Sequence, residues 1–208
     1  MSWWWIPFVT KTCKAHTAQR RRRTGKYKDP QSSWTKTTKG WEYGRKVHMS
    51  LDAQNLLIQD WMTTTAAVHD STVAKTQIDS GQGYKYFLAD SAYDSQQVYR
   101  YIFDRSSMIP VIDTNKRKGI SLEKQSQARW LGIQLRQIYA EKYKNRWEIE
   151  RTINILQEYF NLEYIWYVRN RNYDAILGLA ILAYNLCVMF NILNNRPHRK
   201  VADIVGCY

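Results

Sequence analysis

The sequence has few cysteines, few acidic residues and no export signal. Its three cysteines, Cys13, Cys187 and Cys207, have no Cys-x-x-Cys spacing and do not form an even set. In a chain of 208 residues, this usage indicates reduced thiols and excludes a small disulfide-rich secreted domain. Cys13 and His16 form one Cys-x-x-His pair, but no second pair of ligands follows at zinc spacing. Because the first residues lack a basic region and a small-residue cleavage site, we expect a cytoplasmic protein.

Acidic residues are scarce beside basic ones. The chain has 18 Asp and Glu against 31 Lys and Arg, which gives a net charge of +13. Such an excess indicates an acidic partner, either nucleic acid or an anionic membrane surface. The apolar and charged fractions, 44% and 24%, are typical of folded proteins and exclude wholesale disorder. The length suits one domain, or one domain plus an arm.

The positive charge is concentrated near the N-terminus. Residues 11–46 contain twelve basic side chains and two acids, Asp29 and Glu42. At the centre of this segment lies a basic run that we define as Arg20, Arg21, Arg22, Arg23, Lys26 and Lys28. Such a run repels itself and is exposed, either as a solvated loop or as a segment that neutralises DNA phosphates. Four consecutive arginines favour the second interpretation. We therefore assign residues 1–40 to a basic arm with the remnant of a first strand.

One long apolar segment raises the question of a membrane span. Residues 175–193 contain no charge over nineteen positions, which is close to membrane-spanning length. Asn185 and Asn191 interrupt the segment, and arginines flank it on both sides, so no orientation is indicated. A buried helix in a domain core produces the same pattern, and we favour that interpretation over a membrane span.

The middle of the chain alternates between strand and helix patterns. Residues 41–51 and 56–67 predict a β-hairpin around a turn at 52–55. The segment that follows His69 predicts a helix capped by Asp70 or Ser71.

Further along, two short apolar segments at residues 84–90 and 108–113 predict buried strands, separated by a helix within 91–105. A polar loop is expected at 116–129, followed by one long helix over 134–160. This order predicts an α/β fold, a mixed sheet flanked by helices, with a long C-terminal helical part.

Two acidic residues stand out by their positions. Asp90 ends the predicted strand 84–90, where open α/β sheets place reactive groups, although it is equally suited to cap the next helix. Glu150 lies in the predicted long helix, which places Tyr143, Arg146 and Gln157 on the same face. Arg146 and Glu150 also fit an ordinary i,i+4 surface pair.

Together, the two motifs resemble the catalytic domain of DDE-type insertion-sequence transposases, which has a ribonuclease H-like fold. In that family the second catalytic aspartate stands in an Ala-Asp-x-x-Tyr-Asp context, which residues 89–94 match. The catalytic glutamate follows a Tyr-x2-Arg-x3-Glu-x6-Lys signature, which is matched by Tyr143, Arg146 and Glu150, with Gln157 in place of the lysine. Segments 44–52 and 68–71 resemble the family's hairpin and its exit. The resemblance places the catalytic domain at residues 41–195 and a tail at 196–208.

The resemblance implies metal-dependent cleavage and strand transfer of double-stranded DNA, namely transposon ends and target DNA. Asp90 and Glu150 would be metal ligands for two Mg²⁺ or Mn²⁺ ions, because carboxylates are the ligands that Mg²⁺ prefers. Two such ions can activate the attacking hydroxyl and stabilise the leaving oxygen of a phosphoryl transfer. Tyr143, Arg146 and Gln157 would contact DNA together with the basic run. A nucleoid-associated location and a homo-oligomer are consistent with this function.

The first aspartate of the family is not found at its expected place. It belongs on the first strand in an Asp-Ser-Thr or Asp-Gly-Thr context, but the predicted strand 3–10 contains no acid. Asp29 lies in a turn and Asp52 at the hairpin tip, whereas Asp70 could approach Asp90 as a third catalytic residue. We therefore expect an N-terminally truncated, incomplete transposase. The alternatives are a non-catalytic DNA-binding fragment or regulator and a membrane-associated basic protein.

Overall fold

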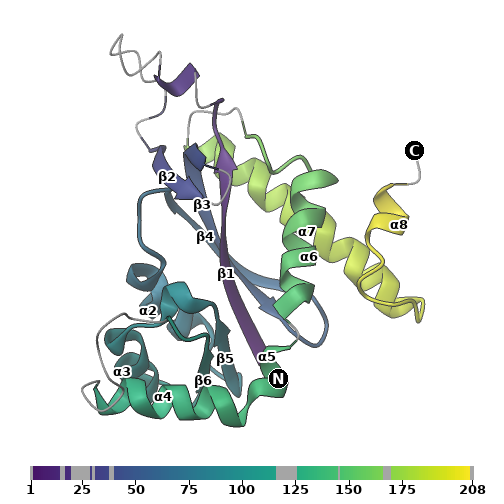
Figure 1. The fold of residues 1–208 in the computed structure, drawn as a ribbon. Helices are drawn as coiled ribbons and strands as arrows, with labels where there is room; N and C mark the ends of the chain where they lie inside the picture. Colours follow the sequence, from purple (N-terminus) through teal and green to yellow (C-terminus); the bar gives the residue numbers. More distant parts are fainter. Residues whose placement is uncertain are drawn as a thin grey trace. The chain divides into compact units, whose positions relative to one another are not determined.

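The computed structural model describes residues 2–14, 17–19, 29, 31–37, 40–115, 126–144, 146–165 and 170–206 (Figure 1). The basic run, Arg20, Arg21, Arg22, Arg23, Lys26 and Lys28, lies outside the described residues. The chain divides into two compact units. The first unit consists of residues 1–6, 49–60 and 69–149, and the second of residues 7–48, 61–68 and 150–208.

The strands form a mixed sheet. They are β1 (Ser2–Lys11), β2 (Ser33–Thr37), β3 (Gly40–Asp52), β4 (Ile58–Thr65), β5 (Tyr86–Ala89) and β6 (Ile109–Ile112). The hydrogen-bonded order is β2-β3-β1-β5-β6, with β4 paired to β3. Strand β5 is parallel to β1 and to β6, whereas β2 is antiparallel to β3. The predicted α/β class and the predicted hairpin are confirmed. The strand β2 was not predicted.

In the first unit, helices pack on the parallel strands. These helices are α2 (Asp70–Ser80), the short 3-10 helix η1 (Ser91–Tyr93), α3 (Gln96–Arg105), α4 (Gln127–Ile138) and α5 (Ala140–Tyr143). A hydrophobic core joins Phe87 of β5 to Ile78 of α2 and Ile102 of α3. Helix α4 packs closely on α3, because a Cβ added to Gly132 would lie 2.1 Å from the Tyr99 ring. The apolar positions of α3 recur at helical spacing, so one face of this helix is buried.

The second unit contains α6 (Arg146–Glu158), whose first four residues belong to the first unit, together with α7 (Asn170–Leu193) and α8 (Ala202–Val205). Strands β1 and β3 approach closely here, because a Cβ added to Gly44 would lie 2.0 Å from the Thr10 carbonyl oxygen. Gly44 therefore allows a backbone contact that any larger residue would block. In the same unit, the Tyr184 hydroxyl of α7 lies 3.1 Å from the Thr152 hydroxyl of α6.

The prediction of one long helix over 134–160 is wrong. The segment forms three helices, α4, α5 and α6, and Tyr139 leaves the helical conformation at φ −100° and ψ 29°. Two aromatic contacts fix the break: the Tyr139 ring lies 5.2 Å from that of Tyr86, and the Tyr143 ring lies 5.2 Å from that of Trp4. Tertiary packing thus overrides a helical pattern of the sequence. Tyr143 consequently lies on a different helix from Arg146.

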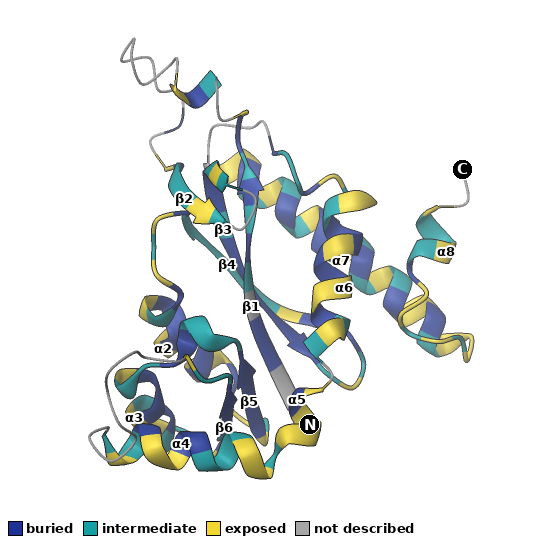
Figure 2. Cartoon of the chain, viewed as in Figure 1, coloured by how far each residue is buried: buried dark blue, intermediate teal, exposed yellow. Residues whose placement is uncertain are grey.

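Three further predictions need correction. The cap of α2 is His69, whose Nδ1 accepts a hydrogen bond from the Ser71 amide, so neither Asp70 nor Ser71 is the cap. The polar loop predicted up to residue 129 ends earlier, because Ser126 caps α4. The segment 175–193 is not a fully buried helix, since α7 exposes one apolar face (Figure 2). By length and composition alone, residues Arg171–Leu193 could also cross a membrane.

Candidate active site

Asp90 follows β5 directly, as predicted. It is the N-cap of η1, and its Oδ1 accepts a hydrogen bond from the Ala92 amide at 3.0 Å. The capping alternative is therefore confirmed. A single capping bond leaves a carboxylate with further acceptor positions, so capping and metal binding do not exclude each other.

The environment of Asp90 disfavours its ionised form. Burial is the largest cause that raises its pKa, and the charges of Asp70 and Asp113 raise it further. The hydrogen bond from Ala92 and the charge of Arg146 act in the opposite direction. When burial and like charges raise the pKa of a carboxylic acid, a cation that binds beside it stabilises the ionised carboxylate.

Asp113 lies beside Asp90 at the end of the neighbouring strand. Ala89 of β5 and Ile112 of β6 are register partners, and the Asp113 amide donates to the Ala89 carbonyl at 3.1 Å. Two parallel strands therefore end in adjacent aspartates at one edge of the sheet. Arg136 lies 3.8 Å from the Asp113 carboxylate, which is 42% exposed.

Tyr143 and Arg146 belong to the same region of the first unit. The Tyr143 ring lies beneath the Arg136 guanidinium, 3.9 Å from the ring centre. Burial and the charge of Asp113 raise the Tyr143 pKa to about 12, with a smaller opposing effect of Arg146. Tyr143 is thus a neutral hydroxyl at neutral pH. Its oxygen is buried without a hydrogen-bond partner among the described residues, which makes it a poor candidate for a surface phosphate contact.

Glu150 and Gln157 belong to the second unit. Glu150 is exposed on α6. Gln157 lines a cleft of about 530 Å³ together with Lys11, Glu42 and Glu163. The Lys11 ammonium contacts both of those carboxylates, at 3.2 and 2.9 Å. Gln157 therefore faces an acidic cleft, in which a DNA phosphate would meet carboxylates.

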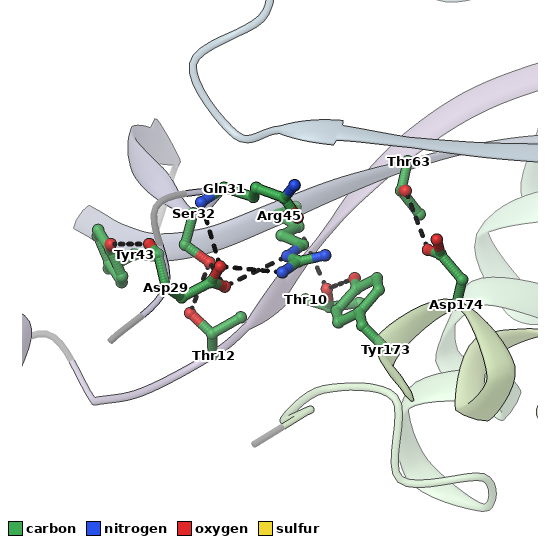
Figure 3. A network of polar contacts seen from close by, with 10 residues as sticks. All are labelled: Thr10, Thr12, Asp29, Gln31, Ser32, Tyr43, Arg45, Thr63, Tyr173 and Asp174. Atoms are coloured by element: carbon green, nitrogen blue, oxygen red, sulfur yellow. Dashed lines mark hydrogen bonds and ion pairs between the residues drawn. The ribbon is translucent and has the colours of Figure 1, made fainter. Parts of the chain in front are cut away.

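Asp29, one of the weaker candidates for the third acid, is part of a buried network in the second unit (Figure 3). Its Oδ1 accepts from Arg45 Nη2 at 2.9 Å, and both side chains are at most 5% exposed. The Ser32 hydroxyl and the Gln31 amide also donate to the Asp29 carboxylate. The Tyr173 ring stacks 4.4 Å from the Arg45 guanidinium. Asp29 is therefore a structural partner of Arg45.

Asp52 and Asp94 also have structural roles. The Asp52 carboxylate accepts from the Gln54 amide at 2.9 Å and from Asn55 Nδ2 at 3.0 Å, which fixes the hairpin turn. Asp94, the last residue of the Ala-Asp-x-x-Tyr-Asp motif, accepts from Arg129 Nε at 2.7 Å. Arg129 is 2% exposed, so Asp94 pairs with a buried guanidinium group within the fold.

The comparisons with known proteins point to one family. The family described as "Transposase DDE domain" matches residues 10–186, which is most of the chain. The chain belongs to this family. No curated protein and no solved structure matches it. Membership implies a transposase whose substrate is DNA, and DDE transposases generally use divalent metal ions.

The predicted site residues of this DDE domain are thus only partly brought together by the described structure. Asp70, Asp90, Tyr143 and Arg146 lie in the first unit, whereas Glu150 and Gln157 lie in the second, so their shared site remains a prediction. No group of three His, Cys, Asp or Glu side chains in the described ranges converges as a metal site. Asp113 was missed, although residues 108–113 end in an aspartate just as residues 84–90 do.

Proposed function

We propose that this DDE domain cleaves and joins DNA strands at a site built around Asp90, with Glu150 as the second metal ligand. The observation that carries the proposal is the end of β5, where Asp90 lies next to Asp113 and within the fields of Asp70 and Arg146. Parallel sheets place reactive groups at this carboxyl edge. The negative charges of Asp70 and Asp113 near Asp90 are only partly offset by Arg146, so a divalent cation beside Asp90 would be favoured.

The donor chemistry fits Mg²⁺ or Mn²⁺, since every candidate ligand is a carboxylate. Asp90 and Glu150 would hold the ions, with Asp70 or Asp113 as the further ligand. When bound, two such ions supply activation of the attacking hydroxyl and stabilisation of the leaving oxygen. Arg146 supplies a fixed cation beside Asp90 and can hold a phosphate in a bidentate contact.

The absence of an acid from β1 supports the proposal that this chain lacks the first aspartate of the family and is a weak recombinase. Strand β1 contains no acid, and in the sequence Ile6 directly follows Trp5, the register partner of Ala89. Asp29 and Asp52 are committed to Arg45 and to the hairpin turn. A lost carboxylate would leave one cation weakly held and remove several kcal/mol of transition-state stabilisation.

A second candidate function is that of a non-catalytic DNA-binding regulator, which the missing acid on β1 also favours. Both functions use the net charge of +13 and the basic run for phosphate contacts, with Arg146 near the site. Both also suit a cytoplasmic, nucleoid-associated protein. They differ in whether any metal-dependent cleavage remains.

Strand cleavage separates the two functions. The 208-residue chain is incubated with duplex DNA and Mn²⁺ or Mg²⁺, beside Asp90→Asn, Glu150→Gln and Ile6→Asp. We expect weak cleavage that both neutral variants abolish and that Ile6→Asp increases. Cleavage that is absent from every variant, with DNA binding intact, would favour the regulator. Robust cleavage that persists in Asp70→Ala and Asp113→Ala would refute the incomplete site.

A further inference from the structure

Arg136 is a half-buried cation beside the sheet edge at which β5 and β6 end. It lies in the last turn of α4, within the first unit, and its side chain is 21% exposed. Its Nη2 lies 3.8 Å from the Asp113 carboxylate, which is longer than the roughly 2.7–3.2 Å of a hydrogen bond between nitrogen and oxygen. Arg136 Nε is buried and has no hydrogen-bond partner among the described residues. A guanidinium is a fork of N–H donors, so Arg136 retains donors for an acceptor that the described residues do not supply.

The Tyr143 ring holds the Arg136 guanidinium from one side. The guanidinium carbon lies 3.9 Å from the centre of the Tyr143 ring, which in turn lies 5.2 Å from the ring of Trp4. Trp4 is buried in β1 and is the register partner of Leu88 in β5, so this aromatic platform is anchored in the sheet. An aromatic face attracts a guanidinium without using its N–H donors. Arg136 is therefore held in place with its donors available.

An ordinary surface role does not account for this arrangement. A cation in the last turn of a helix is favoured by the helix dipole, and that effect needs no particular neighbour. The ion pair with Asp113 is long, and its two side chains are 21% and 42% exposed, so it contributes little to stability. Neither effect explains why Arg136 lies over a buried aromatic platform and beside an acid of the candidate active site. A ligand with anionic oxygens accounts for both features.

The charge of the chain and the chemistry of arginine select a DNA phosphate as this ligand. The chain carries a net charge of +13 and belongs to a transposase family, which implies a DNA substrate. Arginine can bind two phosphate oxygens through parallel N–H bonds. We propose that Arg136 is a substrate-binding residue, which holds a DNA phosphate beside Asp90 and Asp113. Tyr143 is the positioning residue that orients the Arg136 guanidinium. Both roles rest on the proposed function, because they place DNA at the same edge of the sheet.

The first experiment measures DNA binding by fluorescence anisotropy over a series of salt concentrations, with EDTA present so that no divalent ion supports cleavage. Arg136→Gln should flatten the slope of log K against log salt concentration by about 0.9, because one phosphate contact is lost. Arg105→Gln is the matched control, since it removes the same charge from an exposed arginine in the last turn of α3, and its slope should equal that of the wild type. An unchanged slope in Arg136→Gln, or an equal change in Arg105→Gln, would overturn the proposal.

Arg136→Lys protects the test against a loss of folding. Lysine keeps the positive charge beside Asp113, but it is a point charge that makes no bidentate contact. We expect Arg136→Lys to keep the slope of the wild type and to bind DNA about tenfold more weakly, because one charged hydrogen bond is lost. Circular dichroism checks that both Arg136 variants are folded. Wild-type affinity in a folded Arg136→Lys would contradict the bidentate contact.

Substitutions of Tyr143 test its positioning role. Tyr143→Leu removes the ring and should weaken DNA binding, whereas Tyr143→Phe keeps the ring and should restore the affinity that Tyr143→Leu loses. Because the two residues act as one unit, the double variant Arg136→Gln/Tyr143→Leu should bind DNA no more weakly than Arg136→Gln alone. Additive losses would refute the positioning role.

DNA binding in EDTA requires no catalysis, so it tests Arg136 independently of the cleavage that Asp90 is proposed to support. Metal-dependent cleavage that is lost in Asp90→Asn, combined with an unchanged slope in Arg136→Gln, would overturn the role of Arg136 alone. No cleavage in any variant, combined with the flattened slope, would overturn the proposed function and keep the phosphate contact of Arg136.

Discussion

Replacement of Asp94 by alanine should be among the most destabilising single changes in the first unit. The carboxylate accepts two hydrogen bonds from Arg129, at 2.7 Å to Nε and 2.5 Å to Nη2, and a third from the Asn115 amide at 2.8 Å. Arg129 is 2% exposed, and without Asp94 its described acceptor is the Asn115 carbonyl at 3.1 Å. Removal of one partner from a buried ion pair costs about 3–5 kcal/mol, because a charge is left buried without compensation.

Urea denaturation, followed by tryptophan fluorescence and circular dichroism, measures this loss. A cost of this size is a large fraction of the free energy of unfolding of a typical domain, which is about 5–15 kcal/mol. Arg129→Met should be destabilising too. The double variant should lose less than the sum of the two single losses, because it leaves no charge buried. Additive losses, within about 0.5 kcal/mol, would refute the reasoning.

A surface pair provides the control for the buried one. The Lys144 ammonium lies 2.5 Å from the Glu141 carboxylate, but the two side chains are 69% and 79% exposed. Exposed pairs contribute little, so Glu141→Ala should change the free energy of unfolding by about 0.5 kcal/mol or less. A loss as large as that of Asp94→Ala would show that burial is not the cause.

The other expectations concern Asp90, Gly132 and the basic run. Because burial and like charges raise the Asp90 pKa, ionisation of Asp90 destabilises the folded state, and the stability of the protein should fall as pH rises through the raised pKa. Asp90→Asn should therefore be more stable than the wild type at neutral pH and lose this advantage in acid. A stability difference that does not change with pH would contradict this. Gly132→Ala should lower the free energy of unfolding, because the added methyl group would overpack against Tyr99. Overpacking costs about 1–3 kcal/mol, whereas the gain in helix propensity is only about 1 kcal/mol. A variant that is more stable in urea denaturation would contradict the close packing. Glutamine substitution of Arg20, Arg21, Arg22 and Arg23 should flatten the slope of log K for DNA binding against log salt concentration by about 0.9 per lost phosphate contact. An unchanged slope would show that these arginines do not bind DNA.

The sequence predicted the strand ends better than the helices. Residues 84–90 and 108–113 are short apolar segments that end in aspartates, and buried parallel strands produce this pattern locally. Asp90 was therefore found, and Asp113 had the same signal. The hairpin was also predicted, because residues 41–51 partly alternate between apolar and polar side chains and a turn signal follows at 52–55.

Features that depend on distant partners were not predicted. The break at Tyr139 results from aromatic contacts with Tyr86 and Trp4, which are far away in sequence. Arg129 was placed in a polar loop, because nothing next to it reveals that Asp94 accepts its hydrogen bonds. The nineteen uncharged residues of α7 could not show that only one face is buried. Both faces of the helix are apolar, so the periodicity of the segment does not distinguish them. The contacts with the Thr152 and Thr63 hydroxyls decide which face packs.

Binding of Mn²⁺ to the full chain, measured by electron paramagnetic resonance, tests the proposed site most directly, because it does not require an active enzyme. The account predicts that the wild type binds Mn²⁺, that Asp90→Asn and Glu150→Gln each weaken this binding by at least tenfold, and that Asp52→Asn, an acid committed to its own turn, binds as the wild type does. Mn²⁺ binding that is unchanged in both Asp90→Asn and Glu150→Gln would contradict a shared carboxylate site.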